Sequence, residues 1–295
     1  MNRDPTLVVS LDFELGWGVI EGGLWRKRER AGVYRNTRGA VRDLVACCDD
    51  LDLPLTWATV GAMIEDPARV DLDHLPADLR DQSYAALRAA EPATFDGRDV
   101  FDVVKRARVT HDVGGHGYAH VRYDYPGVDA ACVMGDIERL ISVLQHHPRS
   151  FVYPRNREGY ADLIAAAGFG CIRGVPRPAR GGRIGRAAAM VALPPPLSEV
   201  GEPLPGLCRT TFSHLFNAGH DQRWRVGLAA WRARRGLARC QLERGLLHIF
   251  THPYDLGALP PLSEAFRAFL RAAADMRDRG QLTIRTMADL APAQP

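Results

Sequence analysis

The sequence has 295 residues, of which 46% are hydrophobic and 25% are charged, and its formal net charge is +3. This composition excludes a disordered, collagen-like or coiled-coil protein, and the small net charge gives no support for nucleic-acid binding. No apolar run reaches the roughly 18 residues of a membrane-spanning helix, and the polar start does not resemble a signal peptide. We therefore expect a cytoplasmic protein whose six cysteines are reduced thiols.

Apolar periodicity predicts strands and helices that alternate along the chain. Short apolar runs predict strands at residues 6–11, 55–60, 109–113, 150–153, 171–173, 246–251 and 282–285. Helical spacing of apolar residues predicts helices at 38–50, 129–147, 158–167, 226–242 and 262–279. Such alternation favours an α/β fold with a parallel sheet or a (β/α) barrel over an α+β fold.

The chain contains no clear linker and no internal repeat, so we expect a single domain over residues 1–295. Residues 174–206 differ from the rest because they are rich in Pro and Gly. We therefore expect a long loop or lid that starts at 174 and extends to about 225.

Polar residues follow several of the predicted strands. In β/α folds the carboxyl ends of the strands meet at one edge of the sheet, where ligands bind. We therefore expect one site that brings together residues from four segments: Asp12 and Glu14; His116 and His120; Tyr153, Arg155 and Asn156; and His252.

His116 and His120 are spaced i, i+4, so on a helical turn both imidazoles lie on one face. Two such imidazoles and a carboxylate form a common divalent-metal site with an open position for water. Gly114 and Gly115, just before them, allow a sharp turn out of the strand. The alternative is a pair of solvated or core histidines.

Asp12 and Glu14 are alternate residues of a strand, so they share a face with Cβ atoms roughly 6.5–7 Å apart. One carboxylate can then bind a metal while the other takes a proton from water. Burying two acids without a cation is costly. The alternative is a solvated strand end with ordinary ion pairs.

Three further features allow both a functional and a structural interpretation. His252, directly after an apolar strand, is either a general acid near neutral pH or a core histidine. Arg155 either orients a carboxylate through a bidentate pair or lies on the surface. The stretch WRKRER at residues 25–30 either holds a phosphate or is a solvated loop.

Four stretches, in this order along the chain, resemble the polysaccharide deacetylase family (NodB homology, carbohydrate esterase family 4). They are SLDFELGWG at residues 10–18, VGGHGYAH at 113–120, FVYPRN at 151–156 and HIFTHPYDL at 248–256. The resemblance implies a distorted (β/α) barrel of about seven strands and metal-dependent hydrolysis of an N-acetyl group on a sugar.

Matched by position, the resemblance implies that Glu14, His116 and His120 bind a divalent metal, with Zn²⁺ expected. It implies that Asp12 is the general base and that His252 protonates the leaving amine, although Asp12 and Glu14 could exchange roles. The expected substrate-binding residues are Trp17, Tyr118, Tyr153 and Asn156.

The chain departs from the family's third motif, which usually has Arg two residues before the Pro. That position is Val152 here, and Arg155 follows the Pro instead, so whether Arg155 reaches Asp12 is open. The family's fourth motif is not found around residues 168–174, where Arg173 stands.

The sequence thus predicts deacetylation of an amino sugar, a small glycoside or a nucleotide-linked sugar, without nucleic-acid partners. One alternative is a deformylase or another C–N hydrolase that acts on a non-sugar metabolite. A second alternative is a carbohydrate-binding relative that has lost catalysis. The sequence does not give the oligomeric state.

Overall fold

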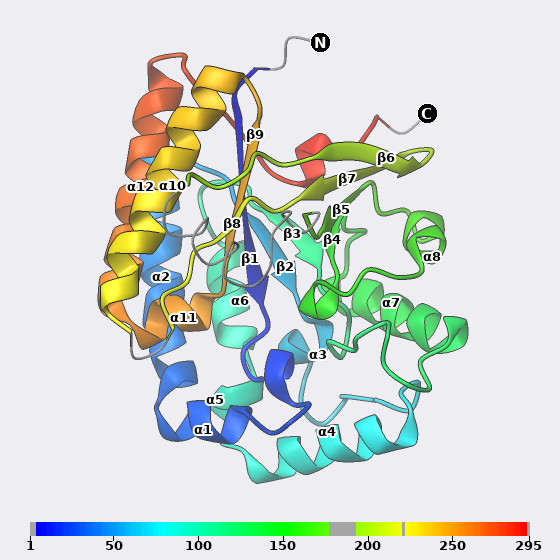
Figure 1. The fold of residues 1–295 in the computed structure, drawn as a ribbon. Coiled ribbons are helices and arrows are strands. Elements are labelled where there is room, and N and C mark those ends of the chain that lie inside the picture. The colour runs from blue at the N-terminus through cyan, green and yellow to red at the C-terminus, as the bar shows by residue number, and fades with distance from the viewer. Residues whose placement is uncertain (1–3, 177–192, 220–221, 294–295) are drawn as a thin grey trace.

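The computed structural model describes residues 4–176, 193–219 and 222–293. Their strands form one sheet in the order β6-β7-β5-β4-β3-β2-β1-β9-β8, with β10 paired to β1 as well. All neighbouring strands are parallel except β6 and β7, which form an antiparallel hairpin. The sheet curls into a distorted, partly open (β/α) barrel (Figure 1).

The strands are β1 (Thr6–Phe13), β2 (Thr56–Thr59), β3 (Asp112–Gly115), β4 (Ser150–Val152), β5 (Cys171–Gly174), β6 (Val200–Leu204), β7 (Leu207–Thr211), β8 (His214–Leu215), β9 (Leu246–Thr251) and β10 (Thr283–Arg285). Each of the seven strands expected from the sequence overlaps one of these. The three additional strands, β6 to β8, lie in the stretch expected to be a loop.

The expected loop from 174 to about 225 is therefore only partly correct. β7 pairs with β5, and β8 pairs with β9, so this stretch extends both sides of the sheet. Residues 177–192 and 220–221 of the expected lid lie outside the described residues.

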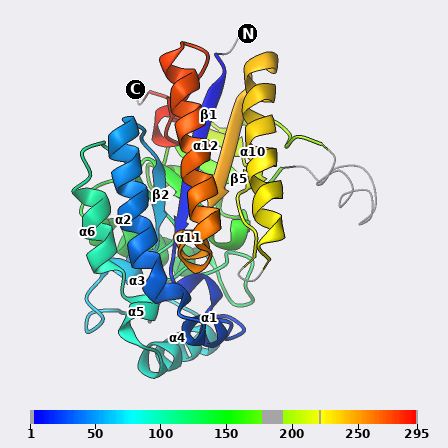
Figure 2. The same cartoon turned by 90° about the vertical axis from the view of Figure 1, so that its left-hand side faces the viewer.

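The longer helices are α2 (Val33–Leu51), α4 (Ala77–Ala89), α6 (Arg98–Lys105), α7 (Ala130–Leu144), α10 (Trp224–Glu243) and α12 (Pro260–Asp278). The shorter ones are α1 (Trp25–Arg30), α3 (Gly61–Ile64), α5 (Pro92–Phe95), α8 (Ala161–Ala166) and α11 (Pro253–Ala258). Helices α2, α6, α10 and α12 cover one side of the sheet (Figure 2), while α1, α4 and α5 lie beyond the carboxyl ends of the strands (Figure 1).

Strand β1 shows how residue alternation builds both the core and the site. Leu7, Val9, Leu11 and Phe13 belong to the large apolar cluster that includes the helices. Val8 instead lies in a small cluster inside the barrel, with Val152, Cys171 and Leu246 among its members. Ser10 and Asp12 continue the face of Val8, because alternate residues of a strand share a face. The inner face thus changes from apolar to polar toward the carboxyl end of the strand.

No helix among the described residues is long and apolar enough to cross a membrane. The six cysteines are all buried, and the described part of the chain contains no disulfide.

Candidate metal and catalytic site

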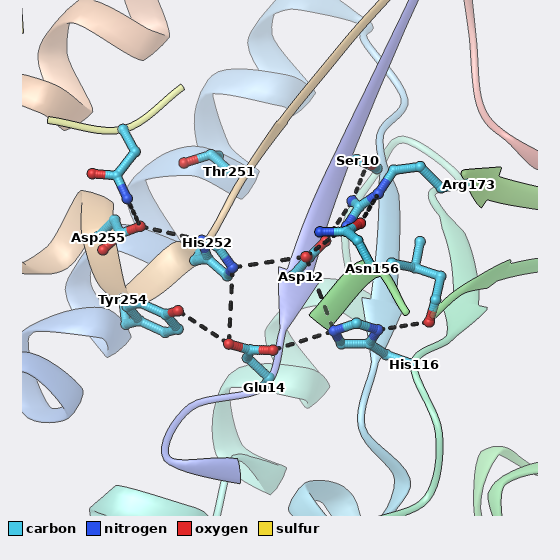
Figure 3. Close-up of polar contacts among 12 residues, drawn as sticks. Ser10, Asp12, Glu14, His116, Asn156, Arg173, Thr251, His252, Tyr254 and Asp255 are labelled. Atoms are coloured by element: carbon cyan, nitrogen blue, oxygen red, sulfur yellow. Dashed lines mark hydrogen bonds and ion pairs between the residues drawn. The ribbon is translucent and has the colours of Figure 1, made fainter. Parts of the chain in front are cut away.

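The carboxyl ends of β1, β3, β5 and β9 bring acids, imidazoles and a guanidinium together (Figure 3). Asp12, Glu14, His116 and Arg173 are at most 4% exposed, and His120 is 7% exposed. Burial of this many ionisable groups is costly unless each is paired or holds a metal. Their contacts therefore decide what the site does.

Glu14, His116 and His120 are the one group of His, Cys, Asp and Glu in the described residues whose ligand atoms fit a metal ion. These atoms all lie within 4.8 Å of one another. The Nε2 of His116 lies 3.2 Å from Glu14 Oε2, and the Nε2 of His120 lies 2.8 Å from it. His120 Nε2 nevertheless lacks hydrogen-bond geometry with any described partner, which suits a nitrogen that donates its lone pair to a cation.

Outer contacts fix the orientation of two of these groups. His116 Nδ1 lies 2.7 Å from the carbonyl oxygen of Val152, so its Nε2 is turned toward Glu14. The Tyr254 hydroxyl donates a 3.0 Å hydrogen bond to Glu14 Oε1. Burial by itself raises the pKa of Glu14, but His120 and His116 lower it well below its ordinary value, so Glu14 is an anion.

The expectation that His116 and His120 lie on a helical turn is wrong. They flank an irregular loop in which Gly117 and His120 have φ values of 73° and 55°. The buried carboxylate of Asp136, in α7, accepts 2.9 Å hydrogen bonds from the backbone N–H groups of Tyr118 and Ala119. Asp136 thus holds the two imidazoles together without a helix.

Asp12 is paired with Arg173 and not with Arg155, which answers the question that the sequence left open. The Arg173 nitrogens Nη1 and Nη2 lie 2.6 and 2.7 Å from the two carboxylate oxygens of Asp12. Arg173 also donates to Ser10 Oγ and to Asn156 Oδ1. Burial raises the pKa of Asp12, but the guanidinium outweighs burial and keeps it below the ordinary value.

Arg155 is exposed and donates a 3.5 Å hydrogen bond to the carbonyl oxygen of Glu21. Arg155 and Asn156 both have left-handed φ values, 52° and 53°, which are strained for non-glycine residues. This turn brings the Asn156 amide oxygen onto Arg173, while Arg155 lines a small cavity of 20 Å³ beside His120 and Trp17.

His252 lies opposite His116, across the two acids (Figure 3). Its Nε2 is 3.7 Å from Asp12 Oδ2 and 3.8 Å from Glu14 Oε1. Its Nδ1 is 3.2 Å from Asp255 Oδ2, which also accepts a 2.8 Å hydrogen bond from Asn217. Burial acts to lower the pKa of His252, but Asp255 and the two acids raise it to about 9.

The remaining expected substrate-binding residues are more buried than such a role suggests. Trp17 is 2% exposed and donates its indole N–H to the carbonyl oxygen of Phe95. The Tyr118 hydroxyl bonds to Glu65, away from the two acids. Tyr153 is fully buried and packs edge-on against Phe151. Of the four expected residues, Asn156 is the one whose side chain contacts Arg173, the partner of Asp12.

Sequence reasoning missed Arg173, Asp136, Asp255 and Tyr254. The alternation Cys171–Ile172–Arg173 was the available signal, because it places Arg173 on the inner face with the small apolar cluster. Asp255 and Tyr254 lie within the matching stretch HIFTHPYDL at residues 248–256, where proximity to His252 pointed to them. Asp136 had no local signal, since its partners are 17 and 18 residues away.

No family model matches the sequence, and no curated protein matches it. Solved structures do match. A protein described as a polysaccharide deacetylase from Mycobacterium smegmatis is 15% identical with a TM-score of 0.63, over 98% of this chain and 90% of that one. A second such protein, from Pseudomonas aeruginosa PAO1, is 14% identical with a TM-score of 0.61, over 97% and 89%.

The Puue allantoinase is also similar, with 15% identity and a TM-score of 0.55 over 97% of this chain and 88% of that one. These matches span nearly the whole chain, although so low an identity concerns the fold alone. They confirm the architecture that the four motifs predicted. The chain therefore has the NodB-homology fold of the polysaccharide deacetylases, a distorted (β/α) barrel.

Proposed function

We propose that the protein is a metal-dependent amide hydrolase that removes an N-acetyl group from an amino sugar or a small sugar derivative. The observation that carries this proposal is the buried Glu14–His116–His120 group, with an ionised Asp12 on one side and His252 on the other. The deacetylases among the similar structures support the choice of an acetamide as substrate.

The residues present fit a divalent cation such as Zn²⁺. Two imidazole nitrogens and one carboxylate are a ligand set found in catalytic zinc sites, which keep one position open. When bound there, the cation would supply a Lewis acid that polarises the amide carbonyl and makes a water molecule acidic.

Asp12 and His252 have complementary positions for proton transfer. Asp12, held ionised by Arg173, accepts the proton of the attacking water. Asp255 holds His252 through Nδ1, so the Nε2 of His252 faces Asp12 and Glu14. From there, His252 donates a proton to the departing amine. Asn156 directs its oxygen to Arg173, which leaves its NH₂ group as a donor for substrate.

Metal content and acetate release test this proposal together. We expect purified protein to bind Zn²⁺ stoichiometrically and to release acetate from at least one member of a panel of N-acetylated sugars, with and without UDP. His116→Ala should abolish both properties, whereas His147→Ala, an exposed histidine outside the site, should change neither. Wild-type turnover by His116→Ala would refute the assignment.

A second candidate function is hydrolysis of another C–N bond, including deformylation, in a non-sugar compound. The similarity to an allantoinase favours it, because that enzyme is named for a non-sugar substrate. Release of formate or ring opening of allantoin, without acetate release, would select this candidate.

A protein that binds N-acetylated sugars but neither binds metal nor releases product would be a carbohydrate-binding relative. The cytoplasmic location stays a prediction for cell fractionation.

A further inference from the structure

Helix α1 places one of its cations against the candidate site. The Cζ atom of Arg28 lies 4.6 Å from the ring centroid of Tyr254. The hydroxyl of Tyr254 donates to Glu14, and its ring stacks on His252 with centroids 4.8 Å apart. The Tyr254 ring therefore separates the Arg28 cation from Glu14, the expected metal ligand, and from His252, the expected general acid.

Two of the donor atoms of Arg28 make no hydrogen bond in the described part of the chain. Its Nε and Nη1 atoms are shielded from solvent and make no hydrogen bond there. The hydroxyl of Tyr34 is buried beside the same guanidinium, interacts with it, and makes no other hydrogen bond among the described residues. Arg28 as a whole is half-buried, so part of it remains open to a ligand.

The other charges of the centre already have counter-charges. Arg173 neutralises Asp12, His252 and Asp255 are paired, and Glu14 lies between two imidazoles that fit a cation. No ion pair of Arg28 occurs among residues 4–176, 193–219 and 222–293, which contrasts with Arg173 and with Arg209, paired to Glu158. A guanidinium that neighbours Tyr254 and Tyr34 but forms no ion pair in the described part of the chain favours an anionic ligand, because its planar donors match a carboxylate or a phosphate.

We propose that Arg28, together with the Tyr34 hydroxyl, binds a carboxylate or phosphate group of the substrate beside the catalytic centre. This inference rests on the proposed amide hydrolysis and narrows it to acidic N-acylated compounds. Of the cations in WRKRER, Arg28 is the one placed for this role. Its neighbour Arg26 is exposed, with its guanidinium 4.4 Å from the ring centroid of Trp25.

The kinetic test uses the zinc-loaded full-length protein and three related substrates: N-acetylglucosamine, its 6-phosphate, and N-acetylmuramic acid, which carries a carboxylate. We expect the wild type to prefer one or both acidic compounds. Arg28→Gln should lower kcat/KM for the preferred acidic compound about 10- to 100-fold, as expected for a lost charge-assisted contact, and change that for N-acetylglucosamine less than about 2-fold. The matched control Arg26→Gln should leave all three values unchanged.

Tyr34→Phe should produce a smaller loss with the same selectivity for acidic compounds. An equal loss on neutral and acidic substrates in Arg28→Gln would overturn the proposal, since Arg28 would then only support Tyr254. Unchanged kinetics on every substrate would overturn it as well. The comparison of the 6-phosphate with N-acetylmuramic acid shows whether Arg28 binds a phosphate or a carboxylate.

Calorimetric binding separates failure of this inference from failure of the proposed function. We expect the wild type to bind N-acetylglucosamine 6-phosphate or N-acetylmuramic acid more tightly than N-acetylglucosamine, and Arg28→Gln to lose that difference. This result would support the anion site even if no compound released acetate. Equal affinity for all three compounds would overturn the anion site even if deacetylation were observed.

Discussion

Replacing Arg173 by Met tests the ion pair on which the site is built. Arg173 is fully buried and makes both nitrogen contacts to Asp12 at 2.6 and 2.7 Å, besides contacts to Ser10 and Asn156. Met has a similar length and no charge, so Arg173→Met removes the cation and leaves Asp12 as a buried acid without its guanidinium.

Loss of one partner of a buried ion pair typically costs about 3–5 kcal/mol, because the remaining charge is uncompensated. Domains of this kind have total stabilities of about 5–15 kcal/mol, so the variant should be measurably weakened yet still folded. Asp12→Asn in the same background removes the remaining charge. The double variant should therefore recover at least about 1 kcal/mol relative to Arg173→Met.

Urea unfolding followed by circular dichroism at pH 7 measures these differences. Arg155→Gln is the matched control, and we expect its effect to be within about 0.5 kcal/mol because Arg155 is exposed. A cost below about 1 kcal/mol for Arg173→Met, or no recovery in the double variant, would refute the reasoning.

Three further predictions concern support of the site and buried histidines. A Cβ atom at Gly18 would overlap the Glu14 carboxylate, so Gly18→Ala should weaken zinc affinity at least about 10-fold in a chelator competition; unchanged affinity would contradict this. Asp136→Asn leaves one of two loop N–H groups without its acceptor, and the same assay should show a loss of about 10- to 100-fold. Burial lowers the pKa of His111 and His214 from 6.5 to about 4, so the unfolded chain binds more protons between these values. The free energy of unfolding should therefore fall as pH decreases from 6.5 to 4, by up to about 1.4 kcal/mol per pH unit for each histidine, and urea titrations of His111→Gln should show a shallower slope.

Local patterns predicted the core strands and the residues at their carboxyl ends. In β1, alternation separates Leu7, Val9 and Leu11 from the inner face that carries Asp12. That periodicity is local, so it is visible in the sequence. It explains why the expected and observed strands overlap at all seven positions.

Features that depend on distant partners could not be predicted in this way. The i, i+4 spacing of His116 and His120 fits both a helix and the observed loop. The loop is stabilised by hydrogen bonds from the backbone N–H groups of Tyr118 and Ala119 to Asp136, which lies in α7. Asp12 and Arg173 are 161 residues apart, so among many arginines no local pattern selected this one. Strand β6 (VGEPL) is mostly exposed and contains Gly and Pro, which are rare in strands, and its pairing with β7 gives it a strand conformation that its own sequence does not predict.

The arrangement of β1 and β10 has a practical consequence for handling the protein. These two strands pair through Thr6–Val8 and Thr283–Arg285, at the end of the sheet opposite Asp12 and Glu14 (Figure 1). The first and last residues that the structure describes therefore lie far from the reactive groups. An affinity tag, a fluorescent fusion or a surface anchor at either end would leave the catalytic face open to substrate.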